Sequence, residues 1–200
     1  MLQVSDLSRP GLGPISFALK MGQCLAVTGP SGAGKTLLLR ALADLDPNEG
    51  TVYLNDLERR MLAAPQWRTK VGLVPAETGW WADTVAQHFS RPGEAAALLE
   101  ALGLPGDALS WQVQRLSTGE RHRLAIARAL QLAPDVLLLD EPTAALDKQA
   151  TKKVEAVLRG QLQAGKAIVL VTHDAAQLKR LAHSQVALSG GKASAQEPVG

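Results

Sequence analysis

The fold of this chain is decided by the stretch Gly29-Pro30-Ser31-Gly32-Ala33-Gly34-Lys35-Thr36. It has the pattern G-x-x-x-x-G-K-[ST], in which glycines let backbone N–H groups turn inward onto phosphate oxygens. Apolar runs precede and follow it, so the loop joins a predicted strand to a helix whose N-terminus attracts anions. Lys35 can then reach the outer phosphates and the Thr36 hydroxyl can ligate Mg²⁺. The alternative is a glycine-rich turn with an unrelated lysine, and the flanking runs favour the phosphate loop.

Length and composition describe an ordinary globular chain. Its 200 residues are 46% hydrophobic and 20% charged, with a formal net charge of +2, so we expect one domain over 1–200 and no binding to nucleic acid. We see no apolar run long enough to span a membrane and no secretory leader, which favours a cytoplasmic location. The single cysteine, Cys24, excludes an internal disulfide and is expected to be buried.

The order of predicted elements indicates an α/β fold. Strands are expected at 15–19, 24–28, 51–54, 71–74, 136–139 and 167–171, and the last two read as strands of a parallel sheet buried on both faces. Helices are expected over 84–116, 120–132 and 151–164, with a helical lobe at about 80–132. The tail from Ser189 onward is small and polar, and we expect it to fray.

Two carboxylates end the apolar strand at 136–139. Asp140 and Glu141 would lie at the carboxyl edge of the sheet, where ligands bind in parallel sheets. Asp140 suits Mg²⁺, directly or through water, and Glu141 suits polarising a water beside the γ-phosphate. The alternative is an acidic pair that caps a helix, and the phosphate loop upstream favours the functional interpretation.

Two further segments can contact an anion. Ser117 and Gly119 precede the helix predicted from Glu120, and offer a hydroxyl, a flexible amide and a helix N-terminus. His173 follows the strand at 167–171, which places its imidazole at the same sheet edge as Asp140. A helix cap and a structural histidine are the respective alternatives.

Taken in order, these segments resemble the nucleotide-binding domain of ABC transporters over nearly the whole chain, from about Leu2 to Ser189. The residues that carry the resemblance are the loop 29–36, Leu116-Ser117-Thr118-Gly119-Glu120 (similar to the family's LSGGQ), Asp140, Glu141, Ala144-Ala145-Leu146-Asp147 and His173. The short length and the run 104–107 are also similar to small ATPases of the FetA/YbbL type, and haem-exporter ATPases are of this size too.

The resemblance implies a P-loop NTPase fold with a mainly parallel central sheet, an N-terminal antiparallel β subdomain and a small helical subdomain. It also implies a head-to-tail pair, either a homodimer or two paired ABC subunits, that hydrolyses ATP with Mg²⁺. Each ATP would lie between the phosphate loop of one copy, including the Leu37 amide, and Ser117, Gly119 and Glu120 of the other. Glu141 and His173 would be catalytic, and Asp147 would lie at the dimer seam. An integral-membrane permease would hold the pair at the inner face of the membrane.

The chain departs from the family pattern at three places. Ala76 stands where a glutamine usually follows the strand 71–74, and Glu77 could compensate by reaching the metal. The stretch 8–13 has no aromatic residue to stack on adenine, which leaves Arg9, Tyr53 or a solvent-exposed base as alternatives. Leu37 replaces a hydroxyl that often contacts the α-phosphate, at a cost of about 1 kcal/mol, one hydrogen bond.

Adjacent tryptophans follow the altered position. Trp80 and Trp81 suit an interface with the permease, although one or both could instead fill the core under the helical lobe. Trp67 and Trp111 are expected to be core or lobe-packing residues. An ATP-binding interaction module with weak hydrolysis and a soluble ABC ATPase outside transport are the two alternative functions, and the sequence does not name a cargo.

Overall fold

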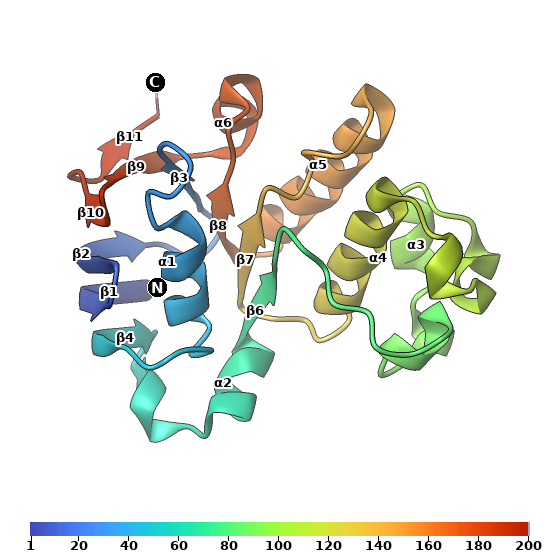
Figure 1. Ribbon diagram of the computed structural model, residues 1–200, viewed down its shortest axis with the longest axis horizontal. Helices are drawn as coiled ribbons and strands as arrows, with labels where there is room; N and C mark the ends of the chain where they lie inside the picture. The colour runs from blue at the N-terminus through green and yellow to red at the C-terminus, as the bar shows by residue number, and fades with distance from the viewer. Residues whose placement is uncertain (200) are drawn as a thin grey trace.

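The computed structural model describes residues 1–199 and divides into a two-sheet body and a helical lobe (Figure 1). Its strands are β1 (Leu2–Arg9), β2 (Leu12–Leu19), β3 (Cys24–Thr28), β4 (Glu49–Leu54), β5 (Leu57–Glu58), β6 (Val71–Val74), β7 (Val136–Asp140), β8 (Ala167–Val171), β9 (Ser184–Ser189), β10 (Lys192–Ala193) and β11 (Glu197–Pro198). Its α-helices are α1 (Lys35–Leu42), α2 (Ala64–Lys70), α3 (Ala96–Ala101), α4 (Thr118–Leu130), α5 (Lys148–Gln163) and α6 (Ala175–Leu181).

The central sheet has the strand order β10-β9-β3-β8-β7-β6, with β11 paired to β9. Strands β3, β6, β7, β8 and β9 are parallel to their neighbours among these five. Side chains alternate across the sheet, so Val136 and Leu138 of β7 enter one core while Leu137 and Leu139 enter the other. Because both faces are covered, the strands are nearly continuously apolar, as the sequence predicted.

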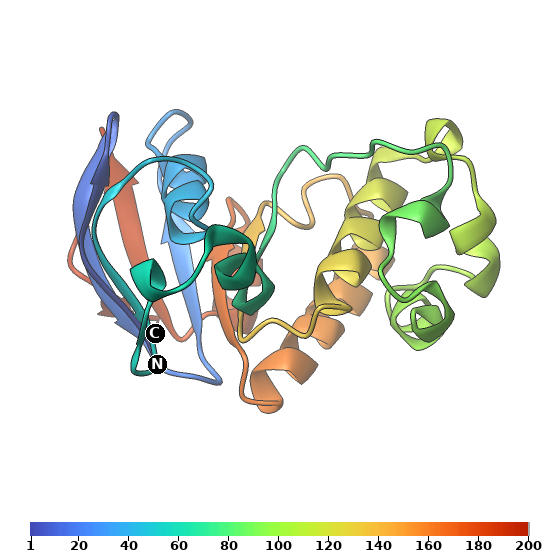
Figure 2. The same ribbon diagram turned by 90° about the horizontal axis from the view of Figure 1, so that it is seen from below.

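The antiparallel sheet β2-β1-β4-β5 packs on the other side of α1. Helix α1 contacts β1 of this sheet and β6, β7 and β8 of the central one, and Figure 2 shows it between the two. Its fully buried residues Leu38, Leu39 and Leu42 belong to the core that fills this space. Trp67 is also buried there, as predicted, and its indole donates a hydrogen bond of 2.8 Å to the Leu42 carbonyl.

The helical lobe is less regular than predicted. Residues 84–116 contain one short α-helix, α3, and 3₁₀ turns at Val85–His88, Pro92–Glu94, Gly106–Ser110 and Val113–Arg115. Pro92 and Pro105 interrupt the helical pattern because proline removes a backbone donor. The lobe packs on the second core, formed with α4, α5 and the opposite face of the central sheet, and Trp111 lies against it as expected.

The prediction of a frayed tail is wrong for the described residues. Strands β10 and β11 both pair with β9, and the Gln196 side chain donates to the Ala18 carbonyl at 3.0 Å and to the Ser184 hydroxyl at 2.9 Å. These partners are distant in sequence, so composition alone did not indicate them. Helices α2 and α6 and strands β1 and β9 were also not predicted as elements.

Among residues 1–199, no helix is both long and apolar enough to cross a membrane.

Candidate nucleotide site

The phosphate loop, residues 29–36, needs glycine at particular positions. Gly29 has φ +136°, and a Cβ there would lie 2.1 Å from the Leu188 carbonyl oxygen. Gly34 has φ +101° and caps α1. A side chain at either position would be strained, so the loop keeps its backbone amides accessible only with these glycines.

Lys35 lies across the concave side of this loop. Its ammonium donates to the carbonyls of Gly29 and Pro30 at 2.8 and 2.9 Å, and the residue is 7% exposed. The positive charge is therefore held at the loop by two neutral acceptors, which a phosphate oxygen can replace with a stronger charge-assisted hydrogen bond. A pocket of about 250 Å³ adjoins it, lined by Ser31, Gly32, Gly34, Lys35, Thr36, Leu37, Asp140, Glu141 and His173.

Thr36 and Asp140 meet although they are far apart in sequence. The Thr36 hydroxyl, in the first turn of α1, donates to the Asp140 carboxylate at the end of β7 over 2.7 Å. Burial raises the pKa of Asp140, and the hydrogen bond from Thr36 opposes that rise. Two hard oxygen donors at one point fit Mg²⁺, which would also favour the ionised carboxylate.

Glu141 and His173 lie beside this pair, because β7 and β8 are neighbours and end together. His173 Nε2 is 3.1 Å from Glu141 Oε1, and both side chains reach solvent. The Glu141 backbone has φ +50°, and its amide donates to the Val171 carbonyl at 3.0 Å. A glutamate held in this uncommon conformation directs its carboxylate to the pocket that Lys35 enters.

Ser117 and Glu120 form a capping box at the start of α4. Glu120 Oε2 accepts from both the Ser117 amide and the Ser117 hydroxyl at 2.8 Å, and the Glu120 amide donates to Ser117 Oγ at 3.3 Å. Within the described residues, neither Ser117 nor Gly119 lines the phosphate-loop pocket of its own chain. Gly119 instead packs on residues 141–147, where a Cβ on it would approach the Ala145 carbonyl oxygen and Leu146 to 3.1 Å.

Asp147 ends this segment and caps α5. Its carboxylate accepts from the amides of Gln149 and Ala150 at 2.8 Å each, and these hydrogen bonds lower its pKa. The residue therefore has a local structural role, and a place at a dimer seam stays a prediction.

The two adjacent tryptophans have different environments. Trp80 packs against the second core, whereas Trp81 is 73% exposed. The Arg128 guanidinium lies 4.8 Å from the Trp80 ring and 5.0 Å from the Trp81 ring, and burial lowers the pKa of Arg128. His88 Nε2 accepts from the amides of Trp81 and Ala82 at 2.9 and 3.1 Å, which fixes the loop that carries both rings.

Both residues proposed to stack on adenine have polar partners elsewhere in the chain, and a stacking role for either stays a prediction. The Arg9 guanidinium is paired with Asp46, which Arg40 also grips in a bidentate contact at 2.6 and 2.7 Å. Tyr53 donates to Glu58 on the antiparallel sheet at 3.4 Å. The sequence missed the Arg9–Asp46 pair because nothing local connects residues 37 positions apart.

Sequence reasoning also missed His122, which bridges two parts of the site. Its Nδ1 lies 2.9 Å from the Thr118 carbonyl and its Nε2 lies 2.8 Å from the Ala76 carbonyl. It thus connects the start of α4 to the position of the missing glutamine. A histidine on a helix face carries no sequence signal for such a contact.

The fold and the site define a nucleotide-binding domain of the P-loop class: a strand, a phosphate loop and a helix, with acidic residues at the end of a neighbouring strand. A family model described as "ABC transporter" matches residues 12–144. An ABC transporter ATP-binding protein of Streptomyces coelicolor is 38% identical over 196 residues, which are 92% of this chain and 35% of that protein. The phosphate import ATP-binding protein PstB 2 of Natronomonas pharaonis is 34% identical over 209 residues, which are 90% and 72% of the two chains.

Among solved structures, the ATP-binding cassette MJ0796, in a dimeric post-hydrolysis state bound to ADP and Pi, has a TM-score of 0.86 over 99% of this chain and 98% of its own. At 24% identity, that likeness shows the fold. This chain belongs to the ABC transporter family, and it matches the ATP-binding domain of the family's members. It spans about a third of the Streptomyces relative's length.

Proposed function

We propose that this domain binds and hydrolyses ATP and that hydrolysis drives a separate membrane permease. The observation that carries the proposal is the meeting of two pairs beside Lys35 at one sheet edge. The Thr36 hydroxyl lies 2.7 Å from Asp140 Oδ2, and His173 Nε2 lies 3.1 Å from Glu141 Oε1. Phosphoryl transfer needs positioned cationic charge, a metal site and a group that orients water, and these residues supply each of them.

The roles follow from the geometry. Lys35 would exchange its two carbonyl acceptors for oxygens of the β- and γ-phosphates. Thr36 and Asp140 would hold Mg²⁺, which supplies charge neutralisation at the phosphates when bound. Glu141 would accept a hydrogen bond from the attacking water and take its proton. His173 Nε2, which lies 3.1 Å from Glu141 Oε1 in this structure, would exchange that contact for an oxygen of the γ-phosphate.

A second copy would complete the site. Ser117 donates to the Glu120 carboxylate in the described chain, so contact with a phosphate requires the hydroxyl to leave Glu120. Ser117, Gly119 and Glu120 of one copy would then close over the ATP held by the other. Loss of the γ-phosphate would remove these charge-assisted hydrogen bonds and release the pair.

Phosphate release from the purified protein tests this proposal. We expect Mg²⁺-dependent hydrolysis that Lys35→Ala abolishes and that Lys20→Ala, at an exposed position directly after β2, leaves unchanged. Glu141→Gln is expected to bind ATP, hydrolyse it slowly and migrate as a dimer in saturating ATP. Equal phosphate release by the wild type and Lys35→Ala would overturn the proposal of an enzyme, and a monomeric Glu141→Gln protein would overturn the dimer.

The permease would dock in the groove that runs beside Trp81 between β6 and α4. This groove, of about 510 Å³, contains Arg40, Arg68 and Arg128, and no carboxylate among its lining residues. Its walls are otherwise largely apolar, with Leu45, Val74, Pro75 and Leu132 among them. A cytoplasmic helix with one apolar face and at least one carboxylate would match both properties.

Pull-down of a multi-span membrane protein encoded in the neighbouring reading frame tests the docking surface. We expect Trp81→Ala and Arg128→Gln to weaken capture while ATP binding stays unchanged. Met61→Ala, at an exposed apolar position outside the groove, serves as the control. Equal capture by the wild type, Trp81→Ala and Arg128→Gln would remove the docking role of Trp81.

A further inference from the structure

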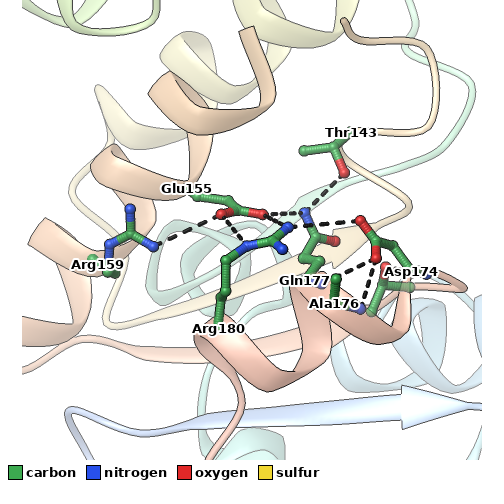
Figure 3. A network of polar contacts seen from close by, with 8 residues as sticks. Thr143, Glu155, Arg159, Asp174, Ala176, Gln177 and Arg180 are labelled. Carbon is green, nitrogen blue, oxygen red and sulfur yellow. Dashed lines mark hydrogen bonds and ion pairs between the residues drawn. The ribbon is translucent and has the colours of Figure 1, made fainter. Parts of the chain in front are cut away.

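A network of polar side chains connects α5 and α6 to residues 141–147, which we call the post-strand loop (Figure 3). We infer that Glu155, Gln177 and Arg180 are positioning residues that fix this loop with Glu141, and that they fix His173 through the start of α6. The inference rests on the catalytic roles proposed above. None of the three residues lines the phosphate-loop pocket, so they would act through others.

Glu155 is the centre of the network. It lies on α5, is 2% exposed, and accepts from Arg180 Nε and Nη2 at 2.8 and 2.7 Å. Arg159 adds an ion pair at 3.7 Å. Because the guanidinium of Arg180 contacts both carboxylate oxygens, this bidentate pair fixes α6 and the carboxylate plane relative to each other.

Gln177 transmits this order to the post-strand loop. The side chain is fully buried, and its Nε2 donates to Thr143 Oγ1 at 2.8 Å and to Glu155 Oε1 at 3.4 Å. Its Oε1 has no hydrogen-bond partner among the described residues. A flipped amide would place that oxygen against the Glu155 carboxylate, so Glu155 holds the amide donor toward Thr143.

Both catalytic groups are close in sequence to these anchors. Thr143 follows Glu141 by two residues, and His173 directly precedes Asp174, which caps α6 through the amides of Ala176 and Gln177 at 2.8 and 3.1 Å. Figure 3 shows Gln177 pointing from α6 to Thr143 and Arg180 lying between Glu155 and Asp174. Helix α6 is therefore connected to both catalytic residues, to Glu141 through Thr143 and to His173 through Asp174.

The same loop also reaches the segment that would act on the second ATP. Gly119 lies against Ala145 and Leu146 of the post-strand loop. A loop fixed at Thr143 thus constrains the distance between Glu141 and the start of α4. The network would therefore position Glu141 for the ATP held by its own copy and the start of α4 for the ATP held by the second copy.

If the network only fastened α6 to α5, removal of the Thr143 hydroxyl would leave kcat unchanged. The Thr143 hydroxyl is at the edge of the network, so its removal leaves the Glu155–Arg180 pair in place. Thr143→Val removes the acceptor at nearly constant volume, and Thr143→Ser retains it. Thr151→Val is the matched control, because the Thr151 side chain makes no hydrogen bond among residues 1–199.

Steady-state phosphate release gives kcat and KM for these variants, with ATP affinity and Tm measured alongside. We expect Thr143→Val to lower kcat about 10-fold, since small displacements of catalytic groups have effects of this order or larger. Its KM, its ATP affinity and its Tm are expected to match the wild type. Thr143→Ser and Thr151→Val are expected to keep the wild-type kcat.

Gln177→Leu provides the second arm. If Gln177 acts through Thr143, the double variant Gln177→Leu/Thr143→Val should lose no more kcat than the more impaired single variant. Wild-type kcat in Thr143→Val, or additive losses in the double variant, would overturn the inference. Glu141→Gln distinguishes a failure of the proposed catalytic roles from a failure of the positioning inference. Full activity of Glu141→Gln would refute the catalytic roles themselves. An inactive Glu141→Gln together with a wild-type kcat in Thr143→Val would refute only the positioning.

Discussion

The two-sheet body and the helical lobe are held together in different ways. In the body, backbone ladders join β3, β6, β7, β8 and β9, and side chains fill the cores on both faces. In the lobe, many connections run from a side chain to a distant carbonyl. Arg123 donates to the Gly103 carbonyl at 2.9 Å, and Arg121 donates to the Val113 carbonyl at 2.9 Å.

This difference shows where each kind of function can be placed. The phosphate loop and Asp140 need fixed geometry, and they lie at the ends of ladder-bonded strands. The lobe carries Ser117 and one wall of the groove beside Trp81, which would serve partners that bind reversibly. Because separate side-chain contacts hold the lobe, it can open locally without loss of the body.

The largest effect on stability is expected when one buried leucine from each region is replaced by alanine. Leu138→Ala, in β7, should lower the free energy of unfolding by about 2–5 kcal/mol, because it leaves a cavity between the two sheets. Leu99→Ala, equally buried in α3, should instead raise hydrogen exchange mainly over 84–116. Chemical denaturation and exchange mass spectrometry measure both. Equal protection losses in β7 and β8 from Leu99→Ala would show that the two regions unfold together.

A second prediction concerns the link between the lobe and the end of β6. His122→Ala removes both carbonyl contacts and should cost about 1–3 kcal/mol, since buried polar groups lose a partner. Exchange should rise at 76–80 and 117–122 and stay constant in β3 and β8. Gln114→Ala, on the exposed surface of the lobe, is the control. Unchanged exchange in His122→Ala would show that other contacts hold this junction.

Within the body, the triad of Arg9, Arg40 and Asp46 predicts a pH effect. The two guanidinium groups lower the pKa of Asp46 from 3.8 to about 2. A depressed folded-state pKa stabilises the fold above the unfolded pKa, and this stability is lost as pH falls from about 4 to about 2. Asp46→Asn should therefore remove part of the acid dependence of Tm, whereas Asp56→Asn, an exposed control, should not. Identical pH profiles for Asp46→Asn and the wild type would refute this contribution.

The smallest expected effect is on the lobe surface. Trp81→Ala should change the free energy of unfolding by less than about 0.5 kcal/mol, because the ring is 73% exposed. Trp80→Ala should cost more, since Trp80 packs on the second core. Thermal denaturation distinguishes them, and equal costs would contradict the different environments of the two rings.

The same contrast explains what the sequence could predict. The bounds of β3, β6 and β8 were predicted correctly because buried parallel strands are short apolar runs. The phosphate loop, Asp140, Glu141 and His173 were expected together, because parallel strands end at one edge and the motif fixes the order. The structure brings them to one pocket.

Contacts over long sequence distances could not be predicted. The hydrogen bonds from Gln196 to Ala18 and from Gln177 to Thr143 exist only because the fold brings distant segments together. In the lobe, an Ala- and Leu-rich pattern indicated helix, but Pro92, Pro105 and nearby glycines divide it into turns. Arg9 was considered for adenine stacking, and its distant partner Asp46 was not visible in the local sequence.

The central claim is that one copy holds the triphosphate while a second copy closes over it. A structure of Glu141→Gln with ATP and Mg²⁺ tests it most directly. We predict Lys35 and His173 on the γ-phosphate from one copy, and Ser117 on it from the other, released from Glu120. A triphosphate bound with Ser117 still on Glu120, and no second copy over the site, would contradict the account.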